Sequence, residues 1–151
     1  MTLLKFADNV TMAELNPHNF ALKNDYISSL ISTALNVIPY ANLVIGKEKI
    51  LVTKGFLSRS YIQQELQLPK RRVEDFYKHA EGKAIEITWE DFDVESAIAF
   101  TTYMIPIFIK EGDCVKMVID SVKNRLSFYF DSDTKEVGEE TRDGYRIIKQ
   151  Y

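Results

Sequence analysis

The chain has 151 residues, enough for one domain with a single core, and its 46% hydrophobic and 27% charged residues are typical of a folded globular protein. Nineteen basic residues against 22 acidic ones give a formal net charge of −3, which excludes binding to nucleic acid through overall positive charge. The single cysteine excludes an internal disulfide and a cysteine-rich metal site.

The first part of the chain predicts an arm followed by a helix and strands. We expect residues 1–17 to form an N-terminal arm and residues 18–151 to form one domain. A helix is expected from Asp25 to about Val37, because its apolar residues recur at helical spacing and Pro39 would end it. Strands are predicted at 20–23, 42–45, 50–53 and 58–68, the middle two as a hairpin.

The second part of the chain predicts a similar series of elements. They are a strand at 84–87, a helix at about 90–102, an apolar stretch at 104–109, alternating strands at 113–119 and 125–130, an acidic loop at 131–143 and a last strand at 145–151. The order strand-helix-strand-strand-strand then occurs twice, over 20–68 and 84–151. We therefore expect an α+β fold made of two similar halves.

This order of elements resembles one domain of a sliding clamp, the ring protein that tethers DNA polymerases. The resemblance covers residues 18–151. It rests on the helix and hairpin of the first half, the aromatic pair Phe76-Tyr77, and the paired segments Glu111–Asp120 and Asn124–Phe130. It implies a non-enzymatic tether or docking platform in DNA replication or transcription, with a protein partner and without a catalytic residue, metal or cofactor. Known clamp rings contain six such domains, so a ring would need six copies of this chain.

Clamps close by joining the edges of their sheets, so the resemblance also implies surfaces for self-association. The candidate edge strands are 113–119 and 145–151, with side chains Val115, Met117, Ile119, Tyr145 and Ile147. One departure argues against a grip on DNA. The two expected helices contain no lysine or arginine, and a hole lined by them would repel phosphates. This favours partner binding over encircled DNA.

A second interpretation of residues 61–77 is a helix-turn-helix DNA-binding motif. Its recognition helix would span 69–79, begin at Pro69 and present basic side chains to the major groove. Gln63 and Gln67 depart from the usual small residues of that motif. The basic candidates for DNA contact are Lys70, Arg71, Arg72 and Lys78. The alternative is a solvated loop, which the neighbouring Glu74 and Asp75 favour.

Other features of the sequence indicate a protein that acts by binding. A third possibility is a monomeric adaptor or inhibitor of another protein. His18 and His79 are expected on the surface, and the acidic residues at 90–95 are expected to stabilise a helix N-terminus rather than to bind a metal. The apolar stretch Ser96 to Ile109 is too short to span a bilayer, and no signal peptide is evident. We expect an intracellular protein.

Overall fold

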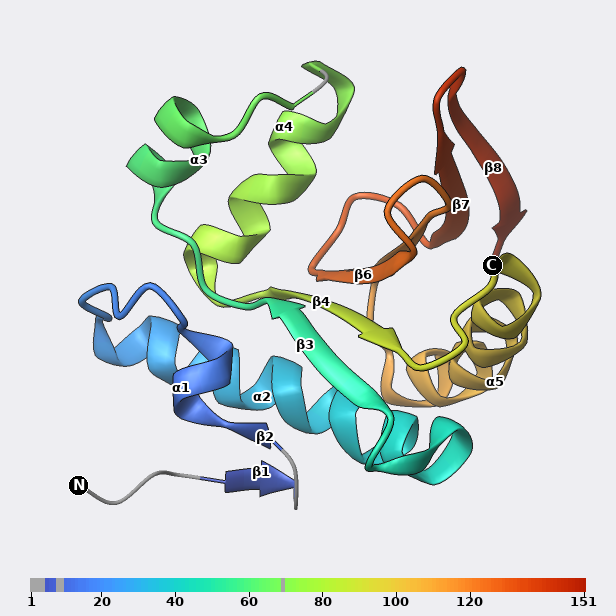
Figure 1. Ribbon diagram of the computed structural model, residues 1–151, viewed down its shortest axis with the longest axis horizontal. Helices are drawn as coiled ribbons and strands as arrows, with labels where there is room; N and C mark the ends of the chain where they lie inside the picture. Colours follow the sequence, from blue (N-terminus) through green and yellow to red (C-terminus); the bar gives the residue numbers. More distant parts are fainter. Residues whose placement is uncertain (1–4, 8–9, 69) are drawn as a thin grey trace.

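The computed structural model describes residues 5–7, 10–68 and 70–151, and a six-stranded mixed sheet forms its centre (Figure 1). The strand order is β3-β4-β6-β5-β7-β8. Every neighbouring pair is antiparallel except β5 and β7, which are parallel. The strands are β3 (Ile50–Lys54), β4 (Ala84–Trp89), β5 (Val115–Asp120), β6 (Arg125–Phe130), β7 (Glu136–Thr141) and β8 (Gly144–Gln150). The α+β class expected from the sequence is confirmed.

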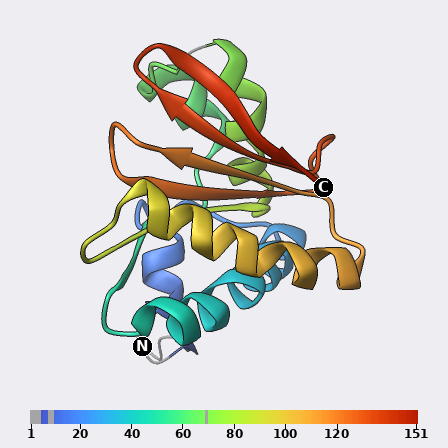
Figure 2. The ribbon, with the colours of Figure 1, turned by 90° about the vertical axis from the view of Figure 1, so that its right-hand side faces the viewer.

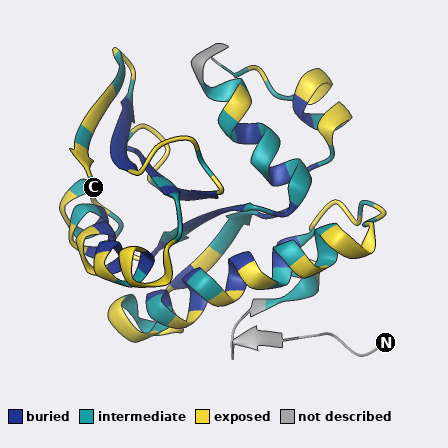
Figure 3. Cartoon of the chain, turned by 180° about the vertical axis from the view of Figure 1, so that it is seen from behind, coloured by how far each residue is buried: buried dark blue, intermediate teal, exposed yellow. Residues whose placement is uncertain are grey.

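Two long helices, α2 (Asn24–Ala41) and α5 (Val94–Glu111), cover one face of the sheet (Figure 2). Both helices are buried on the side that faces the strands and exposed on the outside (Figure 3). The main core lies between the helices and the sheet. Its largest fully buried members are Leu15, Leu30, Ile38, Ile85, Ile87, Phe100, Met104, Phe108, Met117, Ile119 and Phe128.

The α5 helix is longer than the sequence predicted. Asp93 caps its N-terminus by accepting a hydrogen bond from the Ser96 amide at 2.7 Å, and Gly112 ends it at a φ of 75°. The stretch 104–109, read as β-prone, is instead part of this helix. Met104, Ile105 and Phe108 continue the buried stripe, while Pro106 lies on the exposed side, where its ring is accommodated.

The α2 helix passes through Pro39 to Ala41 and continues as the π-helical turn η1 (Asn42–Gly46). The strand predicted at 42–45 is therefore wrong, and only the second half of the expected hairpin exists, as β3. The continuous helical segment 24–46 is apolar and long enough to cross a membrane by length and composition. Part of the same segment packs in the core through Leu30, Ala34 and Val37, whereas its apolar residues Leu35 and Leu43 are exposed.

A helical layer covers part of the other face of the sheet (Figure 1). Helix α3 (Arg59–Glu65) replaces the strand predicted at 58–68, because Ser58 caps it by accepting a hydrogen bond from the Tyr61 amide. Helix α4 (Lys70–Phe76) and the 3₁₀ helix η2 (Tyr77–Glu81) follow. The two helices of the helix-turn-helix interpretation are thus present, although Pro69 lies outside the described residues.

The N-terminal residues contribute the two-stranded pair β1 (Lys5–Ala7) and β2 (Val10–Thr11) and the short helix α1 (Met12–Leu15). With a helix at 59–65, no strand at 20–23 and no strand at 42–45, the described residues do not repeat one element order in two halves. Of the four strands predicted in the first half, only the one at 50–53 exists, as β3. The resemblance to a sliding-clamp domain, and the ring that it implies, remain predictions.

Strand β7 was missed, because residues 131–143 are acidic and were expected to form a loop. Its carboxylates are buried against β8: Glu136 accepts a hydrogen bond from the Tyr145 hydroxyl, and Glu139 accepts one from Arg146 Nε at 2.8 Å. The presence of β7 also corrects the expected edges. Strand β5 lies inside the sheet with Val115, Met117 and Ile119 fully buried, whereas β8, with Tyr145 and Ile147, is an edge strand.

Candidate functional site: a charged cleft on the sheet

The sheet face opposite the main core is polar and largely buried. Side chains of strands alternate between the two faces, and the residues next to the core positions in β4, β5 and β6 are mostly charged or hydroxyl-bearing. They include Glu86, Asp120 and Ser127, each less than 9% exposed. Burial of such groups is costly unless they are paired, so their partners determine what this face can do.

Helix α4 is joined to β5 by two ion pairs of opposite polarity. Arg72 Nη1 lies 3.4 Å from Asp120 Oδ2, and Lys116 Nζ lies 2.8 Å from Asp75 Oδ2. The helix therefore supplies one cation and one anion, and the strand supplies the complementary pair. Asp120 Oδ1 also accepts hydrogen bonds from the backbone amides of Val122 and Lys123 in the following turn, each with an N–O distance of 3.0 Å. These contacts fix α4 in one position along the strand.

Glu86 on β4 is the centre of a second charged group. Its Oε1 lies 3.0 Å from Lys54 Nζ and accepts a hydrogen bond from the Thr53 hydroxyl at 2.9 Å. Arg125 Nε is 3.8 Å away. Burial would raise the pKa of Glu86, but the Lys54 ammonium and the hydrogen bonds outweigh it, and the pKa lies below its ordinary value. Glu86 is therefore held as a carboxylate.

His79 on η2 is completely buried, which corrects the expected surface position. Its Nδ1–H donates to the Gly55 carbonyl at 2.7 Å, while its own carbonyl accepts the Leu57 amide hydrogen at 3.3 Å. The ring packs against Phe76 and edge-on against Tyr129. Burial lowers the pKa of His79 to about 4, so the ring is neutral near pH 7 and its Nδ1 carries the proton.

Helix α4 and the β7–β8 hairpin face each other over the central strands of the sheet (Figure 1). Tyr145 of β8 lies directly over Gly138 of β7, where a Cβ atom would be 2.0 Å from the tyrosine hydroxyl oxygen. Only glycine leaves room for this ring. Lys116 Nζ lies 5.0 Å from the centroid of the same ring, so Tyr145 contacts the ion pair that holds α4.

Three hollows that share lining residues lie along α4 on this face of the sheet, and we call them together the charged cleft. One hollow, of about 40 Å³, is lined by Arg72, Asp75, Lys116, Val118, Glu140 and Tyr145. A larger one, of about 290 Å³, extends past Tyr129 to the loop of Ser132, Asp133 and Thr134. The third, of about 140 Å³, reaches Lys54, Glu86 and Lys123 beneath the α3–α4 link.

The cleft has an apolar floor. Ala84, Val118 and Tyr129 form a small buried cluster on this face of the sheet, and Tyr145 packs against it. Burial raises the pKa of Tyr129 to about 12, so its hydroxyl is neutral. Among the described residues, neither this hydroxyl nor His79 Nε2 has a hydrogen-bond partner. The arrangement is an apolar floor inside a rim of charges of both signs.

The structure brings together residues that the sequence assigned to separate roles. Arg72, proposed for DNA contact, and Tyr145, proposed for self-association, line the same hollow. Lys78 lies 4.0 Å from Glu81 and donates to the Asp131 carbonyl at 2.9 Å, beside the larger hollow. The side chains of Lys70 and Arg71 lie outside the described residues. Contact of these residues with DNA remains a prediction.

A scan against protein-family models gives no match to the chain, and neither do searches of the curated proteins and of the solved structures. The geometry therefore carries the functional argument. Sequence reasoning missed the cleft residues Asp75, Lys116 and Asp120, although a signal existed. The core residues of β5 alternate with Lys116, Val118 and Asp120, and the sequence pattern predicted only the inward set.

Proposed function

We propose that this protein is a non-enzymatic docking module that binds a segment of a partner protein in the charged cleft. The observation that carries the proposal is the apolar floor of Val118, Tyr129 and Tyr145 inside a rim of charges. Protein interfaces have this organisation, with an apolar centre that supplies affinity and a polar rim that supplies specificity. A docking role in replication or transcription, as the clamp resemblance implies, is the setting that we propose for it.

The charge of the cleft favours a protein partner over DNA. A DNA-binding surface needs cations that are free to contact phosphates. Arg72 and Lys116 are instead paired with Asp120 and Asp75, and Lys78 contacts Glu81 and a backbone carbonyl. A partner with side chains of both signs matches this rim better than a polyanion does.

The helix-turn-helix alternative has one observation in its favour, the presence of helices α3 and α4 at the expected place. It predicts that the protein binds duplex DNA, that affinity falls steeply with salt, and that Lys78→Ala weakens binding. Fluorescence anisotropy of labelled duplex DNA measures all three quantities. Salt-dependent binding that Lys78→Ala weakens would overturn the protein-docking proposal in favour of this one.

The docking proposal is tested by filling the cleft. Thr134 is exposed and lines the largest of the three hollows of the cleft, so Thr134→Trp is expected to block the cleft without disturbing the core. Thr102→Trp on the outer face of α5 is the matched control, because it introduces the same side chain at another exposed threonine. A partner captured by the wild type is expected to bind Thr102→Trp equally and Thr134→Trp at least about tenfold more weakly. Equal binding to both variants would refute the assignment.

The size of the protein in solution distinguishes the ring from the adaptor. Six copies of a 17.5 kDa chain would give about 105 kDa by light scattering, whereas a monomeric adaptor runs at 17.5 kDa. If a ring forms, the contact between its subunits is expected to use a sheet edge that is free in the monomer. Strand β8 is such an edge, and a charge at the half-exposed Ile147, as in Ile147→Lys, is expected to dissociate the ring.

A further inference from the structure

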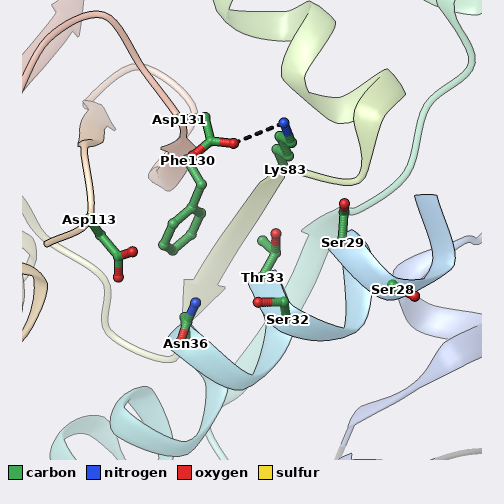
Figure 4. A pocket seen from close by; sticks show the side chains of 9 residues that line it. All are labelled: Ser28, Ser29, Ser32, Thr33, Asn36, Lys83, Asp113, Phe130 and Asp131. Carbon is green, nitrogen blue, oxygen red and sulfur yellow. Dashed lines mark ion pairs between the residues drawn. The ribbon is translucent and has the colours of Figure 1, made fainter. Parts of the chain in front are cut away.

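A further hollow, shown in Figure 4, shares no lining residue with the charged cleft. It is a groove of about 300 Å³ between helix α2 and the ends of the strands. We call it the α2 groove. Its α2 wall consists of Ser28, Ser29, Ser32, Thr33 and Asn36, and its opposite wall of Lys83, Asp113, Phe130 and Asp131.

The two walls of the groove differ in charge. The α2 wall carries only hydroxyl and amide groups, which can donate or accept hydrogen bonds. On the opposite wall Lys83 Nζ and Asp131 Oδ2 are paired at 2.8 Å and neutralise each other. Asp113 is half-buried, and among the described residues its carboxylate makes no hydrogen bond or ion pair. The groove therefore contains one uncompensated negative charge.

The surroundings of Asp113 increase its need for a cationic partner. Burial, with the carboxylates of Glu111 and Asp131 nearby, raises the pKa of Asp113 above its ordinary value. A bound cation would relieve this electrostatic cost. The ring of Phe130 lies between Asp113 and the α2 wall, held edge-on by Phe108 at a centroid distance of 5.6 Å (Figure 4). Phe130 is 8% exposed, and the part of it that lines the groove is where a planar cation or an aliphatic stem can pack.

We propose that the α2 groove binds the guanidinium group of an arginine side chain from a partner protein. A guanidinium has five N–H donors in a plane, and it matches a carboxylate with two parallel hydrogen bonds. Asp113 supplies the carboxylate, Phe130 supplies the ring for stacking, and Ser32 and Asn36 supply acceptors for the remaining N–H groups. The proposal stands independently of the charged cleft.

The test uses the folded 151-residue chain and a pair of matched small probes. Nα-acetyl-arginine methylamide carries the guanidinium, and the citrulline analogue has nearly the same shape without the charge. Binding is measured from amide chemical-shift changes in ¹⁵N-labelled protein. We expect saturable shifts around residues 28–36, 113 and 130–131, with the arginine probe bound at least about tenfold more tightly than the citrulline probe.

Three variants make the assignment falsifiable. Asp113→Asn is expected to reduce binding of the arginine probe to the level of citrulline, whereas Asp143→Asn, at an exposed aspartate of the β7–β8 turn, should leave it unchanged. Ser32→Tyr places a ring in the groove from an exposed position and should abolish binding while the protein stays folded. Equal affinity for the two probes, unchanged binding by Asp113→Asn, or shifts of the same residues by methyl glucoside instead would overturn the proposal.

Discussion

His79 makes the stability of this protein sensitive to mild acid. The ring is fully buried, and its Nδ1–H donates to the Gly55 carbonyl, so protonation of Nε2 would place a cation among Phe76, Tyr129 and the adjacent charged groups. The charges that act on it are those of Glu86, which favours the cation, and of Lys54 and Arg72, which oppose it. Burial is the largest influence, and it keeps the ring neutral.

The magnitude follows from the difference between the folded and unfolded chains. The pKa of His79 is 6.5 when unfolded and about 4 when folded, so below pH 6.5 the unfolded chain binds the proton more readily. Stability therefore falls as the pH drops through 6.5 and levels off below 4. The loss is about 2 kcal/mol between pH 7 and pH 5, and about 3 kcal/mol when complete.

The assay is urea unfolding followed by circular dichroism at a series of pH values from 7.5 to 5. Glutamine cannot titrate, so the free energy of unfolding of the His79→Gln variant is expected to fall less than that of the wild type over this pH range. The difference between the two changes is about 2 kcal/mol. Above pH 5 the buried Glu86 stays ionised in both proteins and cancels in the comparison. If wild type and variant show the same pH dependence, or if NMR titration places the pKa of His79 near 6.5, the reasoning is refuted.

Three further substitutions test the packing of Tyr145 on Gly138, the N-cap of α5 and the ion pair of α4, each by urea unfolding at neutral pH. Gly138→Ala forces the Tyr145 ring to move and is expected to cost about 1–3 kcal/mol; a neutral effect would show that the β7–β8 hairpin tolerates a Cβ there. Asp93→Ala removes the N-cap of α5 and should cost about 1 kcal/mol, a loss that Asp93→Asn largely avoids. Arg72→Met leaves the Asp120 carboxylate without its cation and should cost about 1–3 kcal/mol, and no loss would mean that α4 is held by other contacts.

Much of the fold was predictable because the spacing of apolar residues along the chain indicates the helices and strands. The α2 helix and strands β4, β5, β6 and β8 were predicted at nearly their observed places, since each has a clear apolar period. Two of the errors occurred where the apolar period is ambiguous. Residues 42–45 and 104–109 are continuous apolar runs, which suit a strand or a helix equally, and the chain continued the helix that was already formed.

The candidate site was less predictable because its residues are distant in sequence. Asp75 and Lys116 are 41 positions apart, and nothing local in either segment indicates that they meet. His79 lies in a polar stretch typical of a surface, and only the docking of η2 against Gly55 and Tyr129 buries it. Strand β7 was hidden for the same reason, because Glu136 and Glu139 are buried against Tyr145 and Arg146 of β8, partners that composition does not show.

The alternation of charge and apolar side chains along β5 has a consequence for how the chain selects its fold. Val115, Met117 and Ile119 point into the main core, while Lys116 and Asp120 point to the opposite face. A slip of one residue against β6 would exchange the two sets and place an ammonium and a carboxylate among the aromatic rings beneath α5. Such misregistered states are penalised by several kcal/mol of lost hydration, of order 2–5 for each charge. The ion pairs on this strand can therefore secure a unique alignment even if they add little to net stability.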